Sequence, residues 1–300
     1  MVWNAILKRW AVGAGLAIVA GSAQAGEACL PFTPGDGGTP VISARVNDQG
    51  PFLFILDTAA SGTALDPSMV KTLVPPRDAA TEQAQGMGGP MDVHFYRIAS
   101  MIAGPLAMRD FTAPEIPAPQ LEDQQIAGLA GVDLFGDALT IWRPRQGCVG
   151  VAPTGTLPGG GGWTPIDATW TRPWKIMLPV RIGAVDGLAL LDTGAQYSVL
   201  NPTFARRLGL GAASGRLRPG GEMFGIDGRP LVLSQASVAD VAIGVWRWPV
   251  RSVKIGALPV FDRLGAADAP LMILGMDWLA GHAFAVDYGA NKVWLGQGLD

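Results

Sequence analysis

An internal repeat is the feature that most constrains what this chain can fold into. The segment FILDTAASGTALDPSMVKTL (residues 54–73) matches ALLDTGAQYSVLNPTFARRL (residues 189–208) without a gap. Asp57 falls on Asp192, and every pair keeps the same offset, 192 − 57 = 135. A gap-free match over this length indicates a duplicated structural unit, so we expect two homologous lobes.

Both copies predict the same order of local elements. ARVNDQGPFLFILD and VRIGAVDGLALLD each predict an alternating apolar strand, a turn with glycine, and a second strand that leads to the Asp. Farther along, Asp66-Pro67 and Asn201-Pro202 predict helix starts, because the Asx side chain caps the helix and Pro suits its first position. Each copy therefore predicts a strand, an Asp-bearing turn, a short strand and a helix.

A second shared element follows in each copy. LAGVDLFGDALTIW (residues 129–142) matches ILGMDWLAGHAFAVDY (residues 273–288), and the match places Gly131 on Gly275. Asp133 and its counterpart Asp277 follow these glycines and precede apolar runs, so we expect them to cap helices.

The glycine-rich segment GTLPGGGG (residues 155–162) predicts a flexible linker between the copies. The two predicted lobes then span residues 26–154 and 163–300. With 41 Gly and 24 Pro, the chain favours many short strands joined by turns over a helical bundle. We therefore predict a mostly β fold.

Composition and spacing exclude several classes of site. The formal charge is −3 and no long run of Lys and Arg occurs, which disfavours nucleic-acid binding. His94 and His282 are far apart and show no metal-ligand spacing. The sequence holds neither a phosphate-binding glycine motif nor a Gly-x-Ser-x-Gly motif. We expect no metal and no cofactor.

The N-terminus predicts an export signal. Lys8 and Arg9 precede an apolar run over residues 10–20, and Ala23-Gln24-Ala25 fits a small-residue cleavage site. We therefore expect residues 1–25 to be a signal peptide and the protein to be periplasmic or secreted. The alternative is an uncleaved membrane anchor, for which the apolar run is short against the roughly 20 residues of a typical span.

Two cysteines remain after residue 25, Cys29 and Cys148. In an exported protein an even pair is a disulfide candidate, and this pair would join the two ends of the first lobe. The alternative is two buried free thiols.

Two copies of an Asp-bearing turn suggest two carboxyl groups, Asp57 and Asp192, that meet across a pseudo-twofold axis. Two carboxyls about 3 Å apart cannot both ionise, so they share one proton. The ionised one can take a proton from water while the protonated one polarises a carbonyl oxygen. Such a pair needs a hydroxyl to brace each turn, which Thr58 and Thr193 would supply, and a compact turn, which explains Gly194.

The pattern hydrophobic-Asp-Thr-Gly-Ala at residues 192–195, followed by ILGMDWL, resembles the retropepsin-like aspartic proteases. Both elements occur in order and twice, so the resemblance covers most of the chain beyond residue 25. It implies an acid-protease fold with two homologous β-barrel-like lobes, short helices and a cleft between them. It also implies that Gly131 and Gly275 shape the backbone beneath the catalytic turns, and that one monomer holds both half-sites. The first copy departs from the pattern, because Ala59 stands where the family has Gly.

The resemblance further implies glycine-rich flaps that cover the substrate. One candidate is QAQGMGGPMDV (residues 83–93) and the other is GGEMFGIDGRPL (residues 220–231), with ordinary surface hairpins as the alternative. The flap residues expected to contact substrate are Gly86, Met87, Gly88, Met223, Phe224 and Gly225.

The sequence therefore predicts an exported aspartic endopeptidase that acts on polypeptides, with Asp57 and Asp192 as the pair that activates water. The rival hypothesis is a catalytically weak or inactive module of the cell envelope that uses the same fold to bind peptides or proteins. Ala59 is the reason to retain it, since a methyl group at a position that requires glycine would distort the first half-site.

Overall fold

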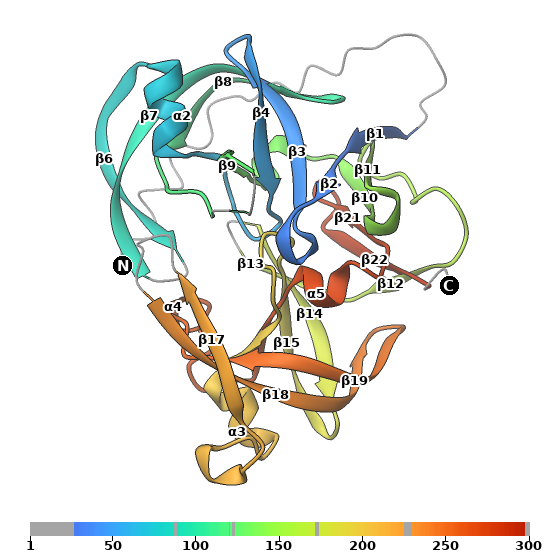
Figure 1. Ribbon diagram of the computed structural model, residues 1–300. Helices are drawn as coiled ribbons and strands as arrows, with labels where there is room; N and C mark the ends of the chain where they lie inside the picture. The colour runs from blue at the N-terminus through green and yellow to red at the C-terminus, as the bar shows by residue number, and fades with distance from the viewer. Residues whose placement is uncertain are drawn as a thin grey trace.

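The computed structural model of the chain describes residues 27–86, 89–119, 121, 124–171, 174–224 and 230–297, without the side chains of residues 79–91 and 224. In these ranges the strands form three sheets. Figure 1 shows the blue-to-green strands of the first copy above the yellow-to-orange strands of the second, with strands of both gathered at one side.

The first copy of the repeat folds into a mixed sheet whose β4 runs parallel to β9. This pairing sets Leu56 opposite Ala130, and the N–H of Asp57 donates to Ala130 O at 2.9 Å. Asp57 therefore begins a turn at the end of a strand held on both sides. The strands are β2 (Thr33–Pro34), β3 (Pro40–Val46), β4 (Gln49–Leu56), β5 (Ala64–Leu65), β6 (Arg77–Gly86), β7 (Gly89–Ala103), β8 (Leu106–Pro114) and β9 (Ile126–Ala130).

The second copy repeats this arrangement. Its β15 runs parallel to β20, which sets Leu191 opposite Leu274, and the N–H of Asp192 donates to Leu274 O at 3.1 Å. Both Asp residues thus leave equivalent strand ends. The strands are β13 (Thr169–Thr171), β14 (Lys175–Ile182), β15 (Val185–Leu191), β16 (Val199–Leu200), β17 (Arg218–Phe224), β18 (Pro230–Ile243), β19 (Trp246–Ile255) and β20 (Leu271–Leu274).

A third, six-stranded sheet takes three strands from each copy. Its central pair joins β10 to β21, with Ile141 opposite Ala285. Beneath it, Phe135 stacks on Tyr288 with ring centroids 5.6 Å apart, so aromatic packing also crosses between the lobes. The strands are β1 (Ala28–Pro31), β10 (Leu139–Arg143), β11 (Cys148–Ala152), β12 (Trp163–Ile166), β21 (Phe284–Asp287) and β22 (Lys292–Gly296).

The predicted helix starts are confirmed. Asp66 caps α2 by accepting from the N–H of Ser68, and Asn201 caps α3 by accepting from the N–H of Phe204. The helices and 3-10 turns are α2 (Pro67–Leu73), α3 (Pro202–Arg207), α4 (Pro259–Arg263), α5 (Met276–Leu279), η1 (Asp36–Gly38), η2 (Val132–Phe135), η3 (Pro144–Gln146) and η4 (Ala212–Ser214).

The prediction that Asp133 and Asp277 cap helices was wrong in its detail. The N-cap positions are Gly131 and Gly275, and each acid is the second residue of the turn or helix that follows. Asp133 accepts from the N–H and hydroxyl of Thr63 at 2.9 and 2.8 Å, while Asp277 does the same with Ser198 at 2.8 and 2.7 Å. Each acid therefore fixes the segment that follows an Asp-bearing turn.

The predicted mostly β fold with two homologous lobes is confirmed by the repeated strand order and the repeated parallel pairing. Cys29 and Cys148 form a disulfide that joins β1 to β11. The signal peptide predicted for residues 1–25 lies outside the described residues. Within the described ranges, no helix has both the length and the apolar character needed to cross a membrane.

Candidate active site

Reciprocal hydrogen bonds between two threonines hold the two Asp-bearing turns together. We call residues 57–61 the first Asp turn and residues 192–196 the second. The N–H of Thr58 donates to Thr193 Oγ1 at 3.1 Å, and the N–H of Thr193 donates to Thr58 Oγ1 at 3.1 Å. Each hydroxyl then donates to the carbonyl before the opposite Asp, Thr58 to Leu191 at 2.9 Å and Thr193 to Leu56 at 2.8 Å.

Both threonines are fully buried, so this network is shielded from water and carries more weight than a surface contact. It fixes the register of one lobe on the other at the point where the two Asp residues begin their turns.

Asp57 is fixed by its own turn and by the opposite lobe. Its Oδ1 accepts from the N–H groups of Ala59 at 2.7 Å and Ala60 at 3.0 Å. Its carboxyl group lies against Gly194, where an added Cβ would stand 2.5 Å from Asp57 Cγ. The carboxyl group of Asp57 therefore contacts the second Asp turn at Gly194, two residues after Asp192.

Asp192 occupies the equivalent place in the second Asp turn. It is 6% exposed, and its Oδ1 accepts from the N–H of Ala195 at 2.9 Å. Burial raises the pKa of Asp192, and the negative charge of Asp57 raises it further. Burial also raises the pKa of Asp57. Two carboxyls that both resist ionisation favour a state in which one of them keeps a proton.

The structure explains why glycine stands at position 194 and how Ala59 is accommodated. Gly194 does not have a positive φ, so it is required by the close approach of Asp57 and not by backbone conformation. Ala59 also lies outside the positive-φ residues, and its N–H still reaches Asp57. The first Asp turn therefore forms with a methyl group present.

Gly131 and Gly275 lie beneath the two turns, where the chain passes very close to itself. A Cβ at Gly131 would stand 2.6 Å from the backbone of Gly62, and one at Gly275 would stand 2.6 Å from that of Tyr197. In addition, the N–H after each glycine donates to the carbonyl of the fourth residue of an Asp turn: Val132 to Ala60 at 3.0 Å, and Met276 to Ala195 at 2.8 Å.

A family model for aspartyl proteases matches residues 42–134 and again residues 178–278. Each match contains one Asp turn and the glycine beneath it, and together the matches cover more than half of the chain. The chain belongs to the aspartyl protease family. A comparison with curated proteins found no match.

The flaps predicted for this aspartyl protease family member fall at the ends of two hairpins. Gly86 pairs with Gly89 where β6 meets β7, and Phe224 pairs with Pro230 where β17 meets β18. Met223, the next-to-last residue of β17, packs against a buried apolar cluster that contains Ala195 and that Ala59 also contacts, so the outer part of the second hairpin shares this cluster with both turns. Met87, Gly88 and Gly225 lie outside the described residues, as does the side chain of Phe224.

Two residues near the pair have no sequence signal that points to them. Lys175 begins β14, and its ammonium group donates to Ala59 O and to Ser61 Oγ in the first Asp turn. Tyr288 is buried beneath the site with no hydrogen-bond partner for its hydroxyl. Burial raises the pKa of Tyr288, and the charge of Asp57 raises it further.

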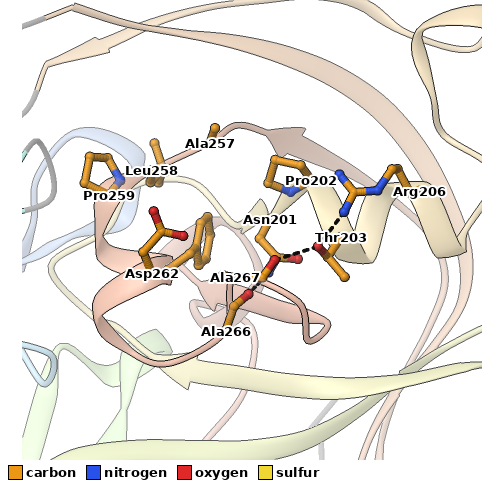
Figure 2. A pocket seen from close by; sticks show the side chains of 11 residues that line it. Asn201, Pro202, Thr203, Arg206, Ala257, Leu258, Pro259, Asp262, Ala266 and Ala267 are labelled. Carbon is orange, nitrogen blue, oxygen red and sulfur yellow. Dashed lines mark hydrogen bonds between the residues drawn. The ribbon is translucent and has the colours of Figure 1, made fainter.

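A separate cavity of about 270 Å³ lies between α3 and the segment that leads into α4, away from the Asp turns. Figure 2 shows that its polar side chains bind one another and the nearby backbone: Asn201 donates to Ala266 O, Thr203 to Ala267 O, and Arg206 to Thr203. The bonds to Ala266 and Ala267 hold the start of α3 to the segment between α4 and β20. The described residues contain no cluster of three or more potential metal ligands.

Proposed function

We propose that the protein is an exported aspartic endopeptidase in which Asp57 and Asp192 share one proton and activate a water molecule. The observation that carries the proposal is the contact of the Asp57 carboxyl with Gly194, in a site braced by Thr58 and Thr193. Membership of the aspartyl protease family supports the same reaction class.

Peptide-bond hydrolysis by such a pair needs neither a metal nor a covalent intermediate. The ionised carboxylate takes a proton from water, and the oxygen of that water bonds to the carbonyl carbon of the substrate. The protonated carboxyl gives its proton to the carbonyl oxygen, so a neutral gem-diol forms. Collapse of the diol breaks the C–N bond as the leaving nitrogen gains the proton first taken from water, while a diol hydroxyl returns its proton to the other carboxylate.

The substrate in this proposal is a polypeptide in extended form. It lies between the lobes beneath the β6–β7 and β17–β18 hairpins and is gripped by strand-like hydrogen bonds. Each lobe supplies one Asp, so one monomer suffices, and neither a cofactor nor a nucleic acid takes part. We further propose that the predicted signal peptide directs the protein to the periplasm or to the medium.

Cleavage of a denatured polypeptide between about pH 3.5 and 8 tests the proposal. We expect Asp57→Asn and Asp192→Asn each to reduce kcat/KM by about 10²–10⁴-fold. Asp186→Asn is the matched control, because Asp186 lies on β15, the strand that leads to Asp192, and forms an exposed ion pair with Arg181. Cleavage that survives both substitutions would contradict the Asp pair, and binding without cleavage at any pH would favour the peptide-binding module.

A further inference from the structure

Lys175 places a positive charge from the second lobe against the first Asp turn. Its Nζ donates to the carbonyl oxygen of Ala59 and to Ser61 Oγ, the latter at 3.2 Å. The side chain thus crosses from one lobe to the other and reaches the loop whose N–H groups hold Asp57. Its position depends on the fold, because it is 116 residues from Ala59 along the chain.

No carboxylate neutralises this charge at ion-pairing distance within the described part of the chain. Ion pairs there include Arg143 with Glu27 and Arg181 with Asp186, and neither involves Lys175. The two direct partners of Lys175 are neutral oxygens. A charge held by neutral groups in a partly buried place acts on nearby titratable groups with little screening.

Lys175 is not repeated at the equivalent position of the first lobe. Ile182 and Val46 end matching strands at an offset of 182 − 46 = 136, so Lys175 corresponds to 175 − 136 = 39, which is Thr39. Thr39 is buried and donates to Asp36 O. At the position equivalent to Lys175, the first lobe therefore carries a neutral side chain.

The other charged and titratable groups near Lys175 and the pair come from two further elements. The positive charge of Arg263, on α4, lowers the pKa of Lys175. The negative charge of Asp57 raises the pKa of Tyr288, which follows β21. Burial lowers the pKa of Lys175, while Asp57 and then Asp192 raise it. In turn, Lys175 is the main influence that lowers the pKa of Asp57 against burial.

We propose that Lys175 is a positioning residue that breaks the symmetry of the pair: its charge against the first Asp turn favours the ionised form of Asp57 over that of Asp192, so Asp57 takes the proton from water while Asp192 donates to the carbonyl oxygen. The proposal rests on the proposed function. The order of effects on Asp192 agrees with it, because burial and the charge of Asp57 raise the pKa of Asp192 while Lys175 has a lesser effect. The two hydrogen bonds of Lys175 also fix the Ala59–Ser61 backbone that carries the donors to Asp57.

Three variants separate the charge of Lys175 from its packing. Lys175→Met keeps most of the side chain and removes the charge, whereas Lys175→Arg keeps the charge. Ser61→Asp leaves Lys175 in place and gives it a carboxylate partner. Removing or pairing a cation raises the pKa of nearby carboxyls, so we expect Lys175→Met and Ser61→Asp to move both limbs of the pH profile of kcat/KM to higher pH. Lys175→Arg should keep the wild-type midpoints even if kcat falls.

A titration that does not depend on cleavage completes the test. In protein labelled with ¹³C at the Asp carboxyl carbons, Asp57→Asn and Asp192→Asn assign the two signals. We expect Asp57 to titrate at lower pH than Asp192 in the wild type, and Lys175→Met to raise the midpoint of Asp57 more than that of Asp192. Unchanged midpoints in folded Lys175→Met and Ser61→Asp would overturn the proposal and leave Lys175 a structural role. A wild type that titrates as expected but cleaves no peptide would instead contradict the proposed function.

Discussion

The carboxyl group of Asp57 rests against the α-carbon of Gly194, with no room for a side chain between them. A Cβ at position 194 would stand 2.5 Å from Asp57 Cγ and 2.6 Å from its Oδ2. The contact joins groups 137 residues apart in sequence (194 − 57). The backbone of the second Asp turn therefore limits the space available to the carboxyl group of Asp57.

Gly194→Ala should displace Asp57 and reduce kcat/KM by about 10²-fold, because catalytic groups tolerate little misplacement. Peptide-cleavage kinetics measure this effect. Gly211→Ala is the matched control, since Gly211 has no positive φ and an added Cβ meets nothing within 4 Å. Equal kcat/KM values for the two variants would show that a methyl group at position 194 does not impair the placement of Asp57 for catalysis.

Thr58→Val and Thr193→Val should each lower the free energy of unfolding by about 1–3 kcal/mol, because the opposite N–H and carbonyl lose partners in a buried place. Urea unfolding measures the loss, and cleavage rates should fall with it. Thr72→Val removes an exposed hydroxyl that bonds Ser68 O and should stay within about 0.5 kcal/mol of the wild type. Three variants of equal stability would contradict an interlobe brace.

Asp133 should make the protein less stable as pH rises. Burial raises the pKa of Asp133 from its ordinary value of 3.8 to about 6, so the folded state holds this proton more tightly than the unfolded chain does. Its contribution is fully present below about pH 4 and is lost as pH rises through about 6. Urea unfolding across this window should show a shallower decline for Asp133→Asn than for the wild type, and parallel curves would refute the assignment.

Loss of the Cys29–Cys148 disulfide should destabilise the protein by up to about 4–5 kcal/mol, because the bond closes a loop of 119 residues in the unfolded chain. The variant pair Cys29→Ala and Cys148→Ala, unfolded in urea beside the wild type, measures this loss. Reductant should lower the stability of the wild type to that of the double variant and leave the double variant unaffected. A wild type insensitive to reductant would mean that the bond does not contribute.

The repeat carried most of the fold prediction, because strand alternation, an Asx-Pro helix start and a shared glycine are local signals that occur twice. The sequence alone was less able to explain why a particular residue type stands at a single position. Gly194 is explained by a contact with the other lobe, and Asp133 binds Thr63 instead of capping a helix. Lys175 could not be found at all, since a single Lys in TRPWKIM gains meaning only when folding brings it to Ala59.

The six-stranded sheet, with β10 of one lobe paired to β21 of the other, makes assembly of the site independent of protein concentration. Two separate half-molecules would have to find each other in solution before their Asp residues could meet. Here the second half arrives tethered, at a high effective concentration, and dilution does not take it away. Because both halves lie in one chain, each can also differ from the other: the first half has Ala59 where the second has Gly194, and the second has Lys175 where the first has Thr39.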